Sequence, residues 1–163
     1  MPYHIALRRV FTLLVLVTPL PGARAQSAAQ TITISVNAIN QIAFVGSPTL
    51  AITTATAGSA PTSAIDATAT WAVTTNQTGA KITASIPTAM PAGLTLSASL
   101  APPAGATSSA MQPLGTTAVD VVTGIGKLAQ AALGVTYRLD ATPAAGVISS
   151  ASRVVTYTIT GGV

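Results

Sequence analysis

The chain is poor in side chains that could perform acid–base or nucleophilic chemistry. It contains one histidine, His4, no cysteine and no glutamate, and its acidic residues are Asp66, Asp120 and Asp140. His4 would be lost with the signal peptide predicted below, so the general bases of the mature chain reduce to three scattered aspartates and two lysines. No G-x-S-x-G nucleophile motif occurs among the serines. The sequence predicts a non-enzymatic protein without a cofactor. A calcium ion held by one of the aspartates and backbone carbonyls stays open as an alternative.

One glycine motif has the outline of a dinucleotide-binding fingerprint. Gly124 to Ala129, GIGKLA, fits G-x-G-x-x-A and follows the strand-like stretch AVDVV. That chemistry needs a βαβ unit with a full helix after the glycines. The only segment with helical character, Lys127 to Leu133, would form about two turns, and no βαβ alternation precedes it. A P-loop is excluded too, because Val121 and Leu128 replace its glycine and its Ser/Thr.

The first 25 residues have the features of a secretory signal peptide. The basic pair Arg8-Arg9 precedes an apolar run, Val10 to Leu20, and an A-x-A cleavage site follows at Ala23 and Ala25. The run of about 11 residues is too short to span a bilayer, which needs roughly 20. We therefore predict cleavage before Gln26, by the general secretory or the twin-arginine route, rather than a buried N-terminal helix. The protein is expected to be exported, to the periplasm, the cell surface or the medium.

Cleavage would remove most of the basic character of the chain. The remaining charged residues are four cations and three aspartates, a formal net charge of +1. No cluster of cations is left to follow a phosphate backbone, so nucleic acid is excluded as a partner. Without cysteine the chain has neither disulfides nor a thiolate metal site.

Residues 26–163 carry the repeated two-residue period of half-buried strands. Thr and Val are abundant, and Gly/Pro turn signals separate the apolar alternations. The clearest alternating segments are residues 30–36, 49–54, 94–100, 133–141 and 153–160. This pattern predicts one all-β domain, an antiparallel immunoglobulin-like β-sandwich of about seven to nine strands.

The single tryptophan lies in TWAVTTNQTGAKITASI, residues 70–86. The pattern predicts a β-hairpin with its turn at Asn76 to Gly79, where Gly79 would adopt a positive φ. Trp71 falls on the apolar face, which favours a core position over an exposed binding aromatic or an assembly contact. Asn76-Gln77-Thr78 also fits a glycosylation sequon, and we interpret it as turn chemistry.

The stretches VDVVTGIGKLAQAALGVTYRLDATPAAGV and SRVVTYTIT resemble the closing strands of a largely uncharacterised group of small secreted bacterial β-sandwich proteins that are rich in Ala and Thr. The chain is more distantly similar to immunoglobulin-like pilin subunits. It departs from them in lacking a cysteine pair and a penultimate tyrosine, so the resemblance does not extend to assembly by a chaperone and usher.

Two functions are compatible with these features. The first is a structural subunit of a surface fibre, pilus or matrix, which assembles with itself or with other surface proteins. Its candidate assembly strand carries Ile32, Ile34 and Val36, which could add to the sheet edge of a neighbour; alternatively, it is the first strand of its own sheet. The second is an extracellular adhesion or glycan/protein-binding module, which an exposed Trp71 or Tyr137 would favour. No membrane span is expected in the mature chain.

Overall fold

The computed structural model describes residue 22 and residues 24–163. The predicted signal peptide therefore lies almost entirely outside the described residues, Ala23 included, whereas Ala25 and Gln26 are described and exposed. The chain divides into two units, residues 1–35 and residues 36–163.

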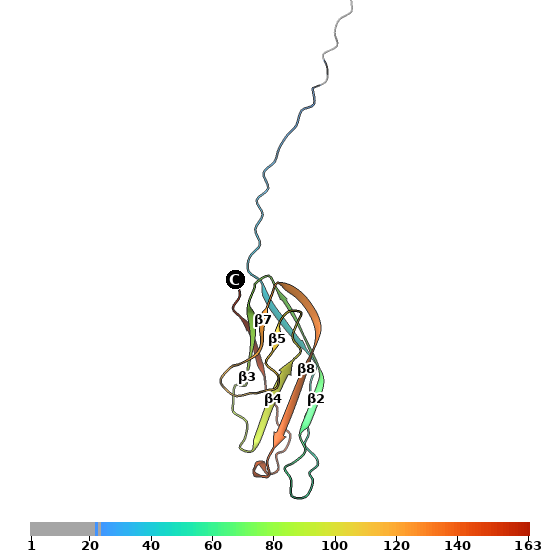
Figure 1. Cartoon of the computed structure of the whole chain (residues 1–163), viewed down its shortest axis with the longest axis vertical. Coiled ribbons are helices and arrows are strands. Elements are labelled where there is room, and N and C mark those ends of the chain that lie inside the picture. The colour runs from blue at the N-terminus through green and yellow to red at the C-terminus, as the bar shows by residue number, and fades with distance from the viewer. Residues whose placement is uncertain (1–21, 23) are drawn as a thin grey trace, which may run out of the picture. The chain divides into compact units, whose positions relative to one another are not determined.

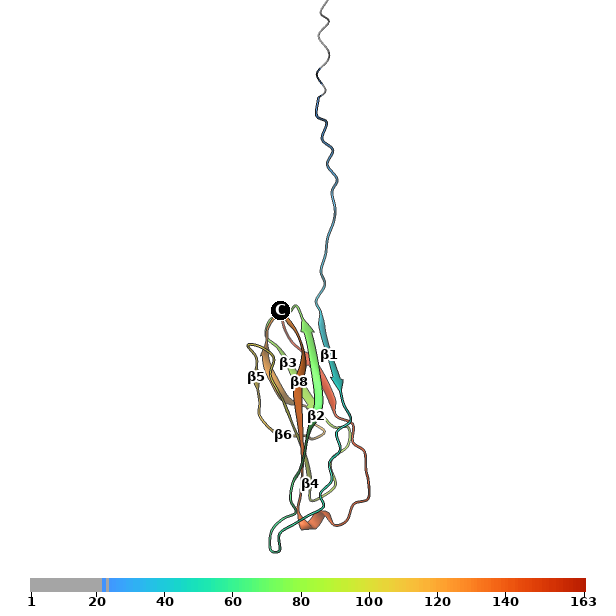
Figure 2. The ribbon, with the colours of Figure 1, turned by 90° about the vertical axis from the view of Figure 1, so that its right-hand side faces the viewer.

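The second unit is built from two antiparallel sheets, as Figures 1 and 2 show. The first sheet has the strand order β1-β2-β8-β4-β6 and the second has the order β5-β7-β3-β9. The elements are β1 (Asn40–Val45), β2 (Ala64–Thr75), β3 (Ala80–Ser85), β4 (Leu94–Leu100), β5 (Thr107–Ser108), β6 (Gln112–Pro113), β7 (Val119–Ile125), β8 (Leu128–Ala141), the 3-10 turn η1 (Pro143–Ala145) and β9 (Thr156–Thr160). The predicted all-β architecture is confirmed.

The core lies between the two sheets and follows the predicted alternation. Ile82 of β3 and Val135 of β8 are fully buried, while the residues next to them in sequence are not. Each sheet thus contributes one apolar face, and burial of these faces supplies most of the stability in a chain without disulfides.

Trp71 is a core residue, as predicted. Only 1% of its surface is exposed, and its indole Nε1 donates a hydrogen bond to the carbonyl oxygen of Ala101 at 3.2 Å. The predicted hairpin around it is wrong, however. Both edges of β2 are occupied, by β1 and β8, and β3 lies in the other sheet between β7 and β9. Residues 76–79 therefore cross from one sheet to the other, with Gly79 at a φ of 78°.

The possible helical turn at residues 127–133 is not formed. Residues 128–141 form the long strand β8, which pairs with β2 on one side and with β4 on the other. Pairing on two edges outweighs the weak local helical preference of its alanines. Residues 124–129 consequently span the tight β7–β8 connection, in which Gly124 has a φ of 72°, and no helix follows the glycines there.

Two other predicted strands are absent from the sheets. Residues 30–36 are exposed and belong to neither sheet, and residues 49–54 form an irregular part of the β1–β2 connection. The immunoglobulin-like part of the expectation is not confirmed. β7 precedes β8 of the first sheet in the chain, yet it pairs with β3 in the second sheet.

The second unit has two distinct ends. At one end, which we call the Asn76 end, residues 37–39, 76–79 and 161–163 meet: Asn76 N donates to the Ile39 carbonyl at 3.2 Å, and Thr78 N to the Val163 carbonyl at 3.0 Å. The opposite end, the loop end, carries the connections 46–63 and 142–155, seen at the bottom of Figure 2. β1 runs from the Asn76 end to the loop end, and β9 runs back.

Candidate functional site: the seam between two edge strands

The three aspartates form no common centre. Asp120 is paired with Lys81 at 2.9 Å, and Asp140 with Arg138 at 2.9 Å, and all four side chains are partly exposed. Exposed pairs of this kind contribute little to stability. Among the residues that the structure describes, no group of three or more acidic, histidine or cysteine side chains could hold a metal ion.

Asp66 instead anchors a loop. Its carboxylate accepts hydrogen bonds from the Thr68 hydroxyl at 2.6 Å, the Thr68 amide at 2.9 Å and the Thr49 amide at 2.9 Å. These donors, the Thr68 hydroxyl above all, lower the pKa of Asp66 below its ordinary value. The side chain therefore fixes the start of the 46–63 connection beside β2.

The two sheets meet at an incompletely closed edge, which we call the seam. β1 is the last strand of the first sheet and β9 the last strand of the second, so each has one edge without a strand partner in the described part of the chain. Phe44 of β1 stacks on Tyr157 of β9, with ring centroids 4.0 Å apart and planes inclined by 12°. The two free edges therefore lie on the same side of the sandwich.

Side chains that point inward at the seam are only partly buried. This set comprises Ile42, Phe44, Val155, Tyr157 and Ile159. By contrast, inward residues one strand further in, such as Val73 on β2 and Ile82 on β3, are at most 2% exposed. Along the seam lies a cavity of about 730 Å³, open to solvent. Apolar side chains that the fold leaves half exposed in a groove mark an incomplete core.

A pair of tyrosines closes the bottom of this groove. The Tyr157 hydroxyl donates a hydrogen bond to the Tyr137 hydroxyl at 2.9 Å, linking β9 to β8 across the two sheets. Burial raises the pKa of both phenols, that of Tyr157 far above its ordinary value near 10. The raised pKa values mean that the folded state favours the neutral form of both phenols. Their contribution to the stability of the fold is present below the pKa of an unfolded tyrosine, near 10, and is lost as the pH rises above about 10.

We therefore expect neither tyrosine of the mature chain to ionise independently of unfolding. In a spectrophotometric titration of the protein beginning at Gln26, the tyrosinate absorbance should stay flat through pH 10. It should then rise together with the loss of the β-sheet circular dichroism signal. Tyr157→Phe should halve the amplitude. A reversible ionisation near pH 10 in the folded protein would contradict this account of the groove.

The candidate assembly strand is exposed. Ile32, Ile34 and Val36 have 76%, 87% and 81% of their surface accessible, and the residues between them are Thr33 and Ser35. The alternative that this segment is the first strand of its own sheet is not confirmed, because the described part of the chain has no strand at residues 31–36. We call residues 31–36 the donor segment.

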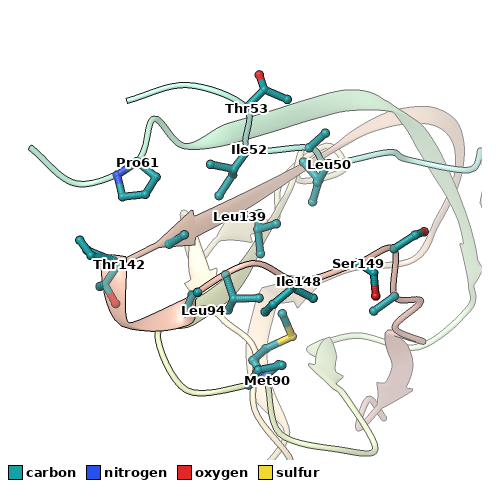
Figure 3. Close-up of a pocket in the computed structure, with 18 of the residues that line it drawn as sticks. Leu50, Ile52, Thr53, Pro61, Met90, Leu94, Leu139, Thr142, Ile148 and Ser149 are labelled. Carbon is teal, nitrogen blue, oxygen red and sulfur yellow. The ribbon is translucent and has the colours of Figure 1, made fainter. Parts of the chain in front are cut away.

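A second pocket lies at the loop end, shown in Figure 3. It has a volume of about 800 Å³, and Leu50, Ile52, Leu94, Leu139 and Ile148 project into it. The alternation of residues 49–54 thus reflects a half-buried loop face, formed by Leu50 and Ile52. The lining is mainly aliphatic with threonines and without an aromatic ring, which suits an apolar group better than a sugar. Leu50 and Leu139 also line the seam cavity, so the two cavities share part of their walls.

The features that would have favoured glycan binding are absent from the described residues. Trp71 and Tyr137 are both buried, at 1% and 8% exposure, so neither offers a stacking surface to a sugar. Sequence reasoning also missed one half of the seam, the edge strand β1. The alternation of Ile42 and Phe44 in NQIAFV was the available signal.

Comparison with known proteins identifies no family for this chain. No protein-family model matches the chain, and neither a curated protein sequence nor a solved structure is significantly similar to it. The part of the chain that the structure describes contains no helix long and apolar enough to cross a membrane. The site is therefore interpreted from its geometry.

Proposed function

We propose that the protein is a non-enzymatic structural subunit of an extracellular or cell-surface assembly, joined by strand exchange. The donor segment of one copy would insert into the seam of another copy. One observation carries this proposal. An alternating apolar segment is largely exposed, and the fold also leaves a groove of half-exposed apolar side chains between two strand edges that are unpaired in the described part of the chain.

The two surfaces are chemically complementary. The free edges of β1 and β9 present unpaired backbone N–H and C=O groups, and an added strand can pair with such an edge. Ile32, Ile34 and Val36 lie on one face of an extended strand and would enter the groove together. Each side chain gains about 1.5–3 kcal/mol on full burial, from which the cost of ordering the segment must be subtracted.

The edges also lack the usual protection against strand addition. Natural edge strands are commonly blocked by lysine, proline or an inward charge. β1 reads NQIAFV and β9 reads TYTIT, so neither strand carries any of these. The low charge of the mature chain further reduces repulsion between copies.

The test compares two forms of the chain by size-exclusion chromatography and negative-stain microscopy. The form beginning at Gln26 should give filaments or large oligomers. A form without residues 26–36 should be a folded monomer. Added QTITISV peptide should bind this shortened form and raise its thermal stability.

The proposal would be contradicted if the longer form stays a folded monomer at high concentration and the shortened form does not bind the peptide. The aliphatic pocket at the loop end would then favour the second function, a binding module. A screen of apolar ligands would follow.

A further inference from the structure

Asn76 holds the residues that lead from the donor segment into β1. Its side-chain Oδ1 accepts a hydrogen bond from Ile39 N at 2.8 Å, and its Nδ2 donates one to the Asn37 carbonyl at 2.8 Å. Its own backbone N donates to the Ile39 carbonyl at 3.2 Å. The backbone pairing of β1 with β2 ends at Asn40 and Thr75, so the Asn76 side chain continues that pairing past the end of β2.

Neighbouring side chains fix this arrangement. Gln77 Nε2 donates to the Asn76 Oδ1 at 2.6 Å, which leaves the amide a single orientation for its Nδ2. One residue further along β1, Asn40 accepts from the Thr75 hydroxyl at 2.6 Å and donates to the Gly161 carbonyl at 3.4 Å. Residues 37–40 are thus held in line with β1 by the side chains of Thr75 and Asn76 and by the backbone of Gly161.

This arrangement opposes closure of the seam by the donor segment of the same chain. The seam begins beside Asn40 and follows β1 toward the loop end. To enter it, the same chain would have to reverse direction within residues 37–39. The reversal would break both side-chain bonds to Asn76, and the segment would then run parallel to β9.

A segment from another copy is free of this constraint. It can run antiparallel to β9, as in the other strand pairings of the second sheet. In that orientation one register places three inward pairs opposite one another: Ile32 with Ile159, Ile34 with Tyr157, and Val36 with Val155. Outward-facing Thr33 then lies opposite Thr158. In self-closure, which is parallel, Thr33 would lie beside Thr156 instead.

We infer that Asn76 is a positioning residue that prevents self-closure and directs the donor segment into a second copy, antiparallel to β9 with Thr33 opposite Thr158. This inference rests on the proposed strand exchange. The body of the donor then lies at the loop end of the acceptor, and the acceptor's own donor segment leaves from its Asn76 end. Contacts of this head-to-tail type do not close on themselves, so they build an open filament.

The absence of native cysteine allows a direct test of the register by disulfide formation. Thr33→Cys combined with Thr158→Cys should form interchain disulfides under mild oxidation and give a ladder of covalent multimers on a non-reducing gel. Thr33→Cys combined with Thr156→Cys is the matched control, because Thr156 and Thr158 are both exposed on the same face of β9. A displacement of two residues, about 6.6 Å along the strand, puts this pair out of disulfide range.

The role of Asn76 is tested by adding Asn76→Ala to both cysteine pairs. Loss of its two side-chain bonds should lower the multimer fraction about tenfold. It should also shift cross-linking to an intrachain disulfide between positions 33 and 156 of a monomer. Asn76→Asp keeps the acceptor oxygen but loses the Nδ2 donor, and it should give an intermediate shift. Circular dichroism establishes that each variant is folded.

The outcomes separate the inference from the proposed function. A ladder from the Thr33/Thr158 pair that is unchanged by Asn76→Ala would overturn the role of Asn76. A covalent product from the Thr33/Thr156 pair with Asn76 in place would overturn the direction of insertion. Strand exchange itself would remain supported if the ladder is unchanged by Asn76→Ala. It would also remain supported if the Thr33/Thr156 product is an interchain disulfide. Monomers without any cross-link in all variants would overturn strand exchange as well.

Discussion

Replacing Ile34 by aspartate in the chain that begins at Gln26 is expected to abolish self-association while the sandwich stays folded. Ile34 is 87% exposed and lies in neither sheet, so the change removes no contact on which the fold depends. In the proposed joint, however, its side chain faces the Phe44 and Tyr157 rings. A carboxylate there would lose its hydration without gaining a partner.

The expected effect is large. The lost burial of isoleucine and the desolvation of the carboxylate together come to at least about 4 kcal/mol, which corresponds to roughly a thousandfold weaker association. Analytical ultracentrifugation over a concentration series measures this change directly. Thermal unfolding should show the stability of the isolated subunit unchanged.

Thr33→Asp is the matched control for this substitution. It places the same charge one residue away, on the face that points outward from the groove. It should leave association within about tenfold of the unmodified chain. Equal disruption by both variants would mean that added charge, and not loss of an inward apolar side chain, prevents assembly. That result would count against the seam as the acceptor.

Replacing Trp71 by alanine is expected to cost about 3–5 kcal/mol of unfolding free energy. The indole is 1% exposed, stacks against Phe44 at 6.0 Å and donates a hydrogen bond to Ala101, so its removal leaves a cavity and an unpaired carbonyl at the centre of the fold. A domain of this size commonly has only about 5–15 kcal/mol in total. Urea unfolding followed by circular dichroism measures the loss.

Ile65→Ala on the same strand provides the comparison. Ile65 is 65% exposed, so its truncation should change the unfolding free energy by no more than about 0.5 kcal/mol. An equally small loss of unfolding free energy in Trp71→Ala would contradict the position of Trp71 in the core. Because Trp71 also supports Phe44 at the seam, the alanine variant should in addition bind the QTITISV peptide less tightly.

The sequence predicted those parts of the fold that depend on local alternation. Residues 94–100 and 133–141 have an apolar side chain at nearly every second position, and both form strands with one buried face. The burial of Trp71 followed from the same pattern. These predictions succeed because a two-residue period directly reflects which side of a strand is apolar.

The failures concern pairing over long sequence distances. Residues 70–86 have the alternation of a hairpin, but no local feature indicates that both edges of β2 are already occupied. The donor segment and residues 49–54 alternate as well as any paired strand does. Whether such a segment finds a free edge depends on the rest of the sheet, and the seam brings together β1 and β9 from opposite parts of the domain.

The straight path of residues 37–39 into β1 has a mechanical consequence for a filament joined as proposed. Tension along the filament would reach the donor segment through β1 and would act parallel to the strand axis. The hydrogen bonds to the acceptor strands would then be loaded in shear and would have to break together, whereas a peeling force would break them one at a time. A joint of this geometry resists pulling far better than its equilibrium affinity alone suggests.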